Sequence, residues 1–178
     1  SFVFEGAKLL TNGPYIDTLY SRTPYWGFYK IILSIVLRLF GKTITAIKIF
    51  NLFLAGLTSI GLFLLGAKVF NSNKLGFVVA LIYIFLPSDI MYKNLPTGEH
   101  IFIMLLPFAY ISFLNLINTE RKNKYLIYLL TTGIMLGIMD MLKQLTVVLL
   151  IAFIIYIIFL DSSSNRLINK LKKKKKIL

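Results

Sequence analysis

Polar side chains suited to acid–base or electrostatic chemistry gather at three places in an otherwise apolar chain. They are Lys48 and Asn51, then Asp89, Lys93, Glu99 and His100, and finally Asp140, Lys143 and Gln144. Ionisable groups at membrane depth are costly and usually face a cavity or one another. Carboxylates beside basic residues suit a site for an anionic substrate or a metal ion. The alternative is that these residues cap helix ends and extend their charged tips into the headgroup layer.

The individual residues carry further alternatives. Glu99 follows "NLPTG" and opens a predicted helix, where the helix dipole alone favours a carboxylate. His100 is the single histidine and has no partner at metal-ligand spacing, so a metal role has little support. Asp89 follows "LPS", where a proline kink could turn it toward the surface. Asn51 could equally form a hydrogen bond between helices.

The segments that must position these residues are those of a membrane protein. The hydrophobic fraction of the 178 residues is 57%, the charged fraction is 15% and the mean hydropathy is +0.78, whereas about a quarter of residues are charged in soluble domains. With no cysteine, disulfides, cysteine-ligated zinc and thiol catalysis are excluded. The net charge of +13 includes the C-terminal "KLKKKKK", which indicates a cytoplasmic flank near anionic lipid rather than nucleic-acid binding.

Beyond Gly41, five apolar segments are long enough, or nearly so, to cross a hydrocarbon core of roughly 30 Å. They are predicted at 47–67, 75–92, 100–117, 125–142 and 145–160. We therefore expect an all-α membrane protein, a polytopic bundle of about five transmembrane helices over residues 47–160. Close helix packing is predicted at Gly56, Gly61, Gly66, Gly133 and Gly137, the last two forming G-x-x-x-G.

Basic loops set the expected orientation by the positive-inside rule. Every second connection between the predicted spans is basic. These connections are "KVFNSNK", "NTERKNK" and the C-terminal lysine run, and all three are therefore expected in the cytoplasm. Residues 161–178 are thus expected to be a cytoplasmic lysine-rich segment. The loops "KNLPTGE" and "DMLKQ" then lie outside the plasma membrane, together with the start of the first span.

The stretch 25–40 resembles a span, but Lys30, Ser34 and Arg38 form a polar stripe along one side of a helix. Crossing the bilayer would cost about 3 kcal/mol for each central charge. We therefore predict an interfacial helix on the outer leaflet, so that residues 1–46 form an external segment. In that segment Arg22 could hold a phosphate through two parallel hydrogen bonds.

Four stretches carry a resemblance to a known family through their order and spacing. They are "AKLLTNGPYID", "RTPYWGFYKIILSIVLRLFG", "KIFNLFLAGLTSIGLFLLGAKVF" and "GIMLGIMDMLKQLTVVLL". The chain resembles the GT-C superfamily of polytopic glycosyltransferases. Within it, the resemblance is to family 39, the branch of dolichyl-phosphate-mannose protein mannosyltransferases and the bacterial lipid A aminoarabinose transferase.

This resemblance implies inverting transfer of a sugar from a polyprenyl-phosphate donor to a glycan, lipid or protein acceptor on the outer face. By position in the motifs, Glu99 resembles an acidic residue of the catalytic or metal-binding cluster. Arg22 resembles the residue that binds the donor phosphate, and Lys143 resembles a lysine facing the same cavity. Asp89 and Lys48 join them as candidate substrate-binding residues. A divalent cation is left open as a cofactor, with its ligands unknown.

One departure from the family pattern concerns its catalytic aspartate, which would lie upstream of "SFVFEGAKLL". Glu5 and Asp17 are out of register with it. The sequence is therefore expected to be an N-terminal fragment, inactive if it stands alone.

Two other classes of protein are alternatives to the transferase. A transporter or permease subunit predicts charges at mid-span depth and an internal repeat, and a structural scaffold subunit leaves the external carboxylates and Arg22 unexplained. The charge-free segments 52–65 and 145–160 favour the transferase.

Overall fold

The computed structural model describes residues 27–86, 95–119 and 121–163. Within these ranges the chain forms helices joined by turns, without a strand. The helices are α3 (Gly27–Phe40), α4 (Ile44–Phe70), α5 (Asn73–Ile84), α7 (Glu99–Asn118), α8 (Lys122–Leu142) and α9 (Thr146–Ser163). The prediction of an all-α membrane protein is confirmed.

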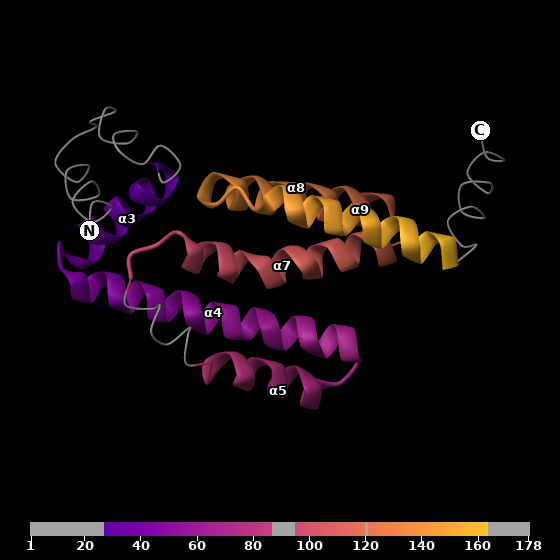
Figure 1. The fold of residues 1–178 in the computed structure, drawn as a ribbon, viewed down its shortest axis with the longest axis horizontal. Coiled ribbons are helices and arrows are strands. Elements are labelled where there is room, and N and C mark those ends of the chain that lie inside the picture. Colours follow the sequence, from indigo (N-terminus) through magenta and orange to yellow (C-terminus); the bar gives the residue numbers. More distant parts are fainter. Residues whose placement is uncertain (1–26, 87–94, 120, 164–178) are drawn as a thin grey trace. The chain divides into compact units, whose positions relative to one another are not determined.

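The chain divides into two compact units, Ser1–Gln144 and Leu145–Leu178. In the first unit, α5, α4, α7 and α8 lie side by side in that order, and α4 and α7 run opposite to α5 and α8 (Figure 1). The beginnings of α4 and α7 and the end of α8 therefore share one end of this bundle. The second unit contains α9, whose apolar part is Thr146–Phe159.

Three of the five predicted spans form helices long and apolar enough to cross a membrane, namely α4, α7 and α8. The other two, α5 and α9, are apolar but shorter. The span predicted over 75–92 ends earlier than expected within the described residues, because α5 stops at Ile84. Pro87 follows closely in the sequence, and a proline disfavours helical geometry in the residue before it.

Short turns with specific backbone geometry set the directions of the first helices. Gly41 joins α3 to α4 with a backbone φ of 91°, a conformation that residues other than glycine rarely adopt. The Oγ1 of Thr43 then accepts a hydrogen bond from the Ala46 amide at 3.2 Å and caps α4. Asn71, in the left-handed conformation with φ 50°, ends α4 so that α5 folds back along it.

Close packing between helices depends on three glycines. A Cβ at Gly61 would lie 2.7 Å from Cγ of Pro107 in α7, and one at Gly76 would lie 2.6 Å from the Phe63 carbonyl oxygen in α4. A Cβ at Gly66 would lie 3.0 Å from Cα of Gly76, so α4 and α5 touch backbone to backbone there. The packing prediction is confirmed for Gly61 and Gly66.

The same prediction is wrong for Gly56, Gly133 and Gly137 within the part of the chain that the structure describes. A Cβ added at any of these positions would meet nothing within 4 Å. The G-x-x-x-G pair of α8 lies on an exposed side of that helix. Spacing in the sequence places two glycines on one face but does not determine which face a neighbour covers.

Hydroxyl groups join α7 to α8 halfway along the bundle. Ser112 Oγ lies 2.7 Å from Thr131 Oγ1, and Thr132 Oγ1 donates to Ser112 Oγ at 2.9 Å. Thr132 also contacts the Tyr128 carbonyl oxygen in its own helix. Hydrogen bonds of this kind help helices associate in lipid, where apolar burial gives little drive.

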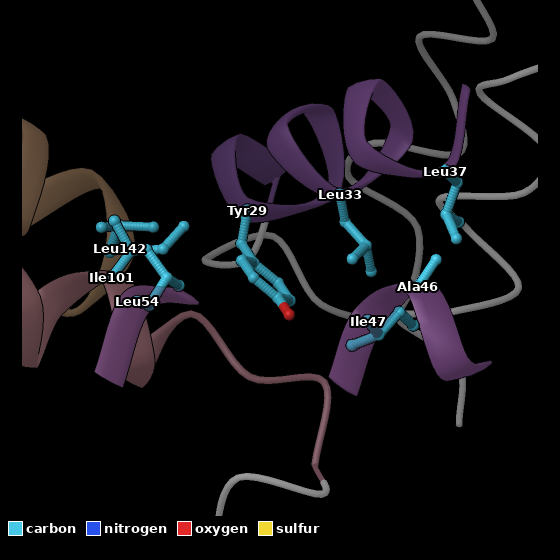
Figure 2. Packing of buried hydrophobic residues seen from close by; sticks show 8 residues of the cluster. All are labelled: Tyr29, Leu33, Leu37, Ala46, Ile47, Leu54, Ile101 and Leu142. Carbon is cyan, nitrogen blue, oxygen red and sulfur yellow. The ribbon is translucent and has the colours of Figure 1, made fainter. Parts of the chain in front are cut away.

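Helix α3 lies across one end of the bundle and not alongside its helices. Figure 2 shows the core cluster that it forms with the terminal parts of the other helices: Tyr29, Leu33 and Leu37 of α3, Ala46, Ile47 and Leu54 of α4, Ile101 of α7 and Leu142 of α8. This arrangement agrees with a helix that does not span, although its place at the membrane surface stays a prediction.

The polar stripe of α3 is arranged differently from the expectation of a simple interfacial helix. Lys30 and Ser34 are buried, and only Arg38 is exposed. On the helix circumference, positions 30 and 34 lie within about 60° of the buried Leu37, whereas Arg38 lies about 100° from it. Burial lowers the pKa of the Lys30 ammonium from its ordinary value. The opposite side of α3 is apolar and exposed, through Ile31, Ile35 and Leu39.

Candidate functional site

The beginnings of α4 and α7 and the end of α8 bring polar residues from distant parts of the sequence to one end of the bundle. Glu99 is the first residue of α7, and Lys143 directly follows α8. Gly98 fits closely between the neighbouring elements, because its Cβ would lie 3.4 Å both from Leu142 Cδ2 and from Tyr29 Cβ. The α3 helix therefore packs directly beside the residue that precedes Glu99.

An ion pair connects two of the predicted site residues. Lys143 Nζ lies 2.6 Å from Glu99 Oε1. The two side chains keep exposed fractions of 41% for Lys143 and 33% for Glu99. A carboxylate and an amine are thus held together, and both stay partly exposed among the described residues. As the first residue of α7, Glu99 also lies where the helix dipole favours a negative charge, so the capping role remains part of its environment.

The turn before Glu99 is fixed by hydrogen bonds to the carbonyl oxygen of Leu95. Asn51 Nδ2 of α4 donates to this oxygen at 3.1 Å. His100 Nε2 lies 3.2 Å from it, and the Thr97 amide donates to it at 3.0 Å. One contact of Asn51 is therefore a hydrogen bond between elements, as the alternative reading of this residue predicts. It joins α4 to the turn that leads into α7.

Two buried hydroxyl groups at the same end have no hydrogen-bond partner within the part of the chain that the structure describes. They are Tyr29 Oη of α3 and Thr97 Oγ1 of the turn before α7. Burial raises the pKa of the Tyr29 phenol above its ordinary value. A buried hydroxyl without a partner costs free energy, which makes each of these groups a candidate for a contact with a bound molecule.

The other predicted residues divide into two groups. Lys48 is on an exposed side of α4 while its neighbour Ile47 is buried, and among the described residues no hydrogen bond or ion pair joins Lys48 to Glu99 or Lys143. Asp140 and Gln144 are exposed near the end of α8. Arg22, Asp89 and Lys93 lie outside the described residues, as do Glu5 and Asp17.

The structure gives His100 a hydrogen-bonding role. Because a carbonyl oxygen can only accept, Nε2 of His100 must carry the proton in its contact with Leu95. Within residues 27–86, 95–119 and 121–163 no group of three histidine, cysteine, aspartate or glutamate side chains is arranged to hold a metal ion.

Three contributors to this end of the bundle were not found from the sequence. Tyr29 and Thr97 resemble ordinary aromatic and loop residues, and Leu95 contributes only its backbone. The one signal in the sequence is the family resemblance of "RTPYWGFYK", which includes Tyr29. This resemblance points to the whole stretch and does not single out Tyr29.

Comparison with known proteins assigns the chain to a family. The sequence model described as dolichyl-phosphate-mannose-protein mannosyltransferase matches residues 24–177. This range contains all six described helices, Glu99 and Lys143. No curated protein and no solved structure matches the chain. Since the family match covers most of the sequence and the described residues form an apolar helical bundle, the chain belongs to the dolichyl-phosphate-mannose-protein mannosyltransferase family and is a membrane glycosyltransferase of the GT-C type.

Proposed function

We propose that the protein transfers a sugar from a polyprenyl-phosphate donor to an acceptor hydroxyl or amine at the outer face of the membrane. The observation that carries this proposal is the Glu99–Lys143 ion pair, which joins a carboxylate to a cation at an accessible end of the bundle. Membership of a mannosyltransferase family supports the reaction class. The sugar and the acceptor stay open within this proposal.

The pair has the two charges that inverting transfer needs. The acceptor oxygen or nitrogen attacks the anomeric carbon while the bond from that carbon to the phosphate oxygen breaks. Glu99 takes the proton that the acceptor loses, and the electron pair of the broken bond stays on the lipid phosphate. Lys143 stabilises the negative charge of the departing phosphate. A substrate phosphate would therefore compete with Glu99 for Lys143 and release the carboxylate to act as a base.

For the other residues of the proposed site we propose a binding role without a specific chemical step. Arg22 is proposed to bind the donor phosphate, and Asp89 and Lys48 to contact the substrate. Lys48 is exposed at the beginning of α4, where it can approach a ligand from the side of that helix. Arg22 and Asp89 rest on the resemblance and the sequence pattern alone.

The main test replaces each member of the pair in the intact protein and follows the transfer of tritiated sugar from a panel of polyprenyl-phosphate sugars, mannose first. Glu99→Gln keeps the shape and removes the base, so kcat should fall by about 100-fold or more with the donor KM nearly unchanged. Lys143→Met should lower kcat by a similar factor, because the leaving phosphate loses its cation.

A matched control lies at the opposite end of the bundle. There Lys68 Nζ of α4 donates to Asn115 Oδ1 of α7, so Lys68→Met also removes a lysine contact between elements. This variant should keep full transfer. If Glu99→Gln transferred sugar as fast as the parent protein, Glu99 would have no part in the reaction. If the parent released sugar from none of the donors, the transporter alternative would lead.

The outer-face part of the proposal rests on the loops between the helices. Lys68, Lys74, Arg121, Lys122 and Lys124 lie at the end away from Glu99, and the positive-inside rule favours the cytoplasm for them. Because the chain has no cysteine, single cysteines can report its topology. A cysteine at Thr45 should react with a membrane-impermeant maleimide on intact cells, and one at Asn123 should react only after permeabilisation. The reverse pattern would place Glu99 in the cytoplasm.

A further inference from the structure

The turn that carries Glu99 is held through a single backbone oxygen. The Leu95 carbonyl oxygen accepts from Asn51 Nδ2, His100 Nε2 and the Thr97 amide, at 3.1, 3.2 and 3.0 Å. A carbonyl oxygen has two lone pairs, so three donors exceed what satisfying this one acceptor requires. Two of the donors are side chains, one from α4 and one from α7. We refer to Asn51, His100 and the Leu95 carbonyl as the Leu95 clamp.

The two side chains of the clamp are buried at positions where apolar residues would avoid the free-energy cost of removing polar groups from water. Asn51 has an exposed fraction of 1% and His100 of 6%. They lie beside the core cluster that includes Ile47, Leu54 and Ile101. Burying polar groups is unfavourable unless hydrogen bonds compensate, and even then an apolar pair is often equally stable. Stability alone therefore does not explain an amide and an imidazole at these positions.

The clamp acts on a short segment that leads directly to the proposed base. Leu95 precedes α7, and Glu99 is the first residue of that helix. The clamp fixes the turn against α4, while Lys143 holds the Glu99 side chain beside the end of α8. Gly98 places the same turn beside α3, since a Cβ there would lie 3.4 Å from Tyr29 Cβ. The segment around Glu99 is thereby joined to α4 by a hydrogen bond and to the end of α8 by an ion pair, and it lies next to α3.

We propose that Asn51 and His100 are positioning residues, which set the place of the Glu99 carboxylate for proton transfer by clamping the Leu95 carbonyl. This inference rests on the proposed function of Glu99. Neither residue needs to touch the substrate. Displacement of a reacting group by about 1 Å can reduce a rate by roughly 100-fold, so a device that fixes the turn has a direct effect on kcat.

The chemistry of the two donors defines matched variants. His100→Gln keeps an N–H at the reach of Nε2, whereas His100→Leu removes it. Asn51→Leu also removes the donor, and Asn51→Asp keeps the shape but offers a carboxylate that can only accept. Thr58→Val is the control, because buried Thr58 lies on the same side of α4 as Asn51 but donates only to Leu54 of its own helix.

The first measurement does not depend on transferase activity. The Leu95 side chain is 47% exposed, so a single cysteine there can carry a nitroxide spin label in this cysteine-free chain. The label should be strongly immobilised in the parent, in Thr58→Val and in His100→Gln. It should become clearly more mobile in Asn51→Leu, Asn51→Asp and His100→Leu. Equal mobility in all variants would overturn the clamp, whatever reaction the protein catalyses.

The second measurement concerns the role of the clamp in the reaction. In variants with normal thermal unfolding midpoints, Asn51→Asp and His100→Leu should each lower kcat by about tenfold, the loss expected for one buried hydrogen bond, with an unchanged donor KM. His100→Gln should restore kcat to within about twofold of the parent. A mobile label with normal kcat, or a change confined to KM, would show that the clamp does not position Glu99.

Failure of the proposed function has a different signature. In that case no transfer would be seen in the parent protein or in any variant, while the spin label would still distinguish clamped from unclamped turns. The role of Asn51 and His100 in positioning Glu99 for the reaction would then be refuted, and only their effect on the mobility of the turn would remain.

Discussion

The two ends of the bundle formed by α4, α7 and α8 each contain a lysine that reaches a neighbouring element. At one end Lys68 donates to the amide oxygen of Asn115 and joins α4 to α7. At the other end Lys143 pairs with Glu99, next to the buried Asn51 and Tyr29. A lysine that crosses between helices is therefore a poor marker of a site by itself. What distinguishes the second end is the convergence of a carboxylate, a cation and buried polar groups from several helices.

The largest expected effect comes from exchanging the two charges of the Glu99–Lys143 pair. In the double variant E99K/K143E the ion pair can form again, so the thermal unfolding midpoint should stay within a few degrees of that of the parent. The proposed base and cation, however, exchange places relative to the substrate, and the transfer rate should stay at least about 100-fold below that of the parent. Full activity of the double variant would mean that the pair only ties α7 to α8.

The second prediction concerns the packing that holds the opposite end of the bundle. Gly76→Ala places a Cβ 2.6 Å from a backbone oxygen of α4 and should destabilise the protein by about 1 to 3 kcal/mol. Gly133→Ala is the matched control, since its Cβ meets open space and alanine favours a helix by up to about 1 kcal/mol. Unfolding of both variants in detergent measures the difference. Equal stabilities would refute the close contact of α4 and α5 at Gly76.

A third prediction concerns the unpartnered hydroxyl of Tyr29. Tyr29→Phe keeps the ring that packs against Gly98 and removes a buried polar atom, so stability should be unchanged or rise by about 1 kcal/mol. If the hydroxyl contacts the substrate, the donor KM should rise severalfold in the same variant. A fall in stability would instead mean that the hydroxyl has a partner in the folded protein.

The smallest expected effect belongs to the lysine of the opposite end. Lys68→Met removes its exposed contact with Asn115, and exposed polar pairs contribute about 0 to 1 kcal/mol. The unfolding midpoint should therefore shift only slightly. A loss of several kcal/mol would show that this contact supports the bundle more strongly than an exposed polar pair should.

Much of the fold followed from sequence patterns that depend on local physics. Long apolar runs predicted α4, α7 and α8, because a helix that crosses lipid needs roughly 20 apolar residues. The alternation of polar loops predicted that Glu99 and Lys143 lie at the same end, since consecutive spans reverse direction. Their direct contact was not predicted, because it depends on how closely α7 and α8 approach.

Other features could not be obtained from sequence because they depend on tertiary contacts. The glycines of α4 and α8 show similar spacings, yet an added Cβ would clash at Gly61 and meet nothing at Gly133. Likewise, burial of Lys30 follows from the face that α3 turns toward α4, which its polar stripe alone does not define. The role of Leu95 is carried by a backbone atom, which no residue type reveals.

The lengths of two helices have a consequence for the depth of this end of the protein in the bilayer. With 20 residues, α7 measures about 30 Å, which equals the thickness of the hydrocarbon core, so in a helix that crosses it Glu99 would reach the boundary with the headgroups. With 27 residues, α4 measures about 40 Å and must tilt or extend past that boundary. The Glu99 carboxylate would then stand at the level where the phosphate of a membrane-anchored lipid also lies. A donor could meet it by lateral diffusion within the leaflet, without leaving the membrane.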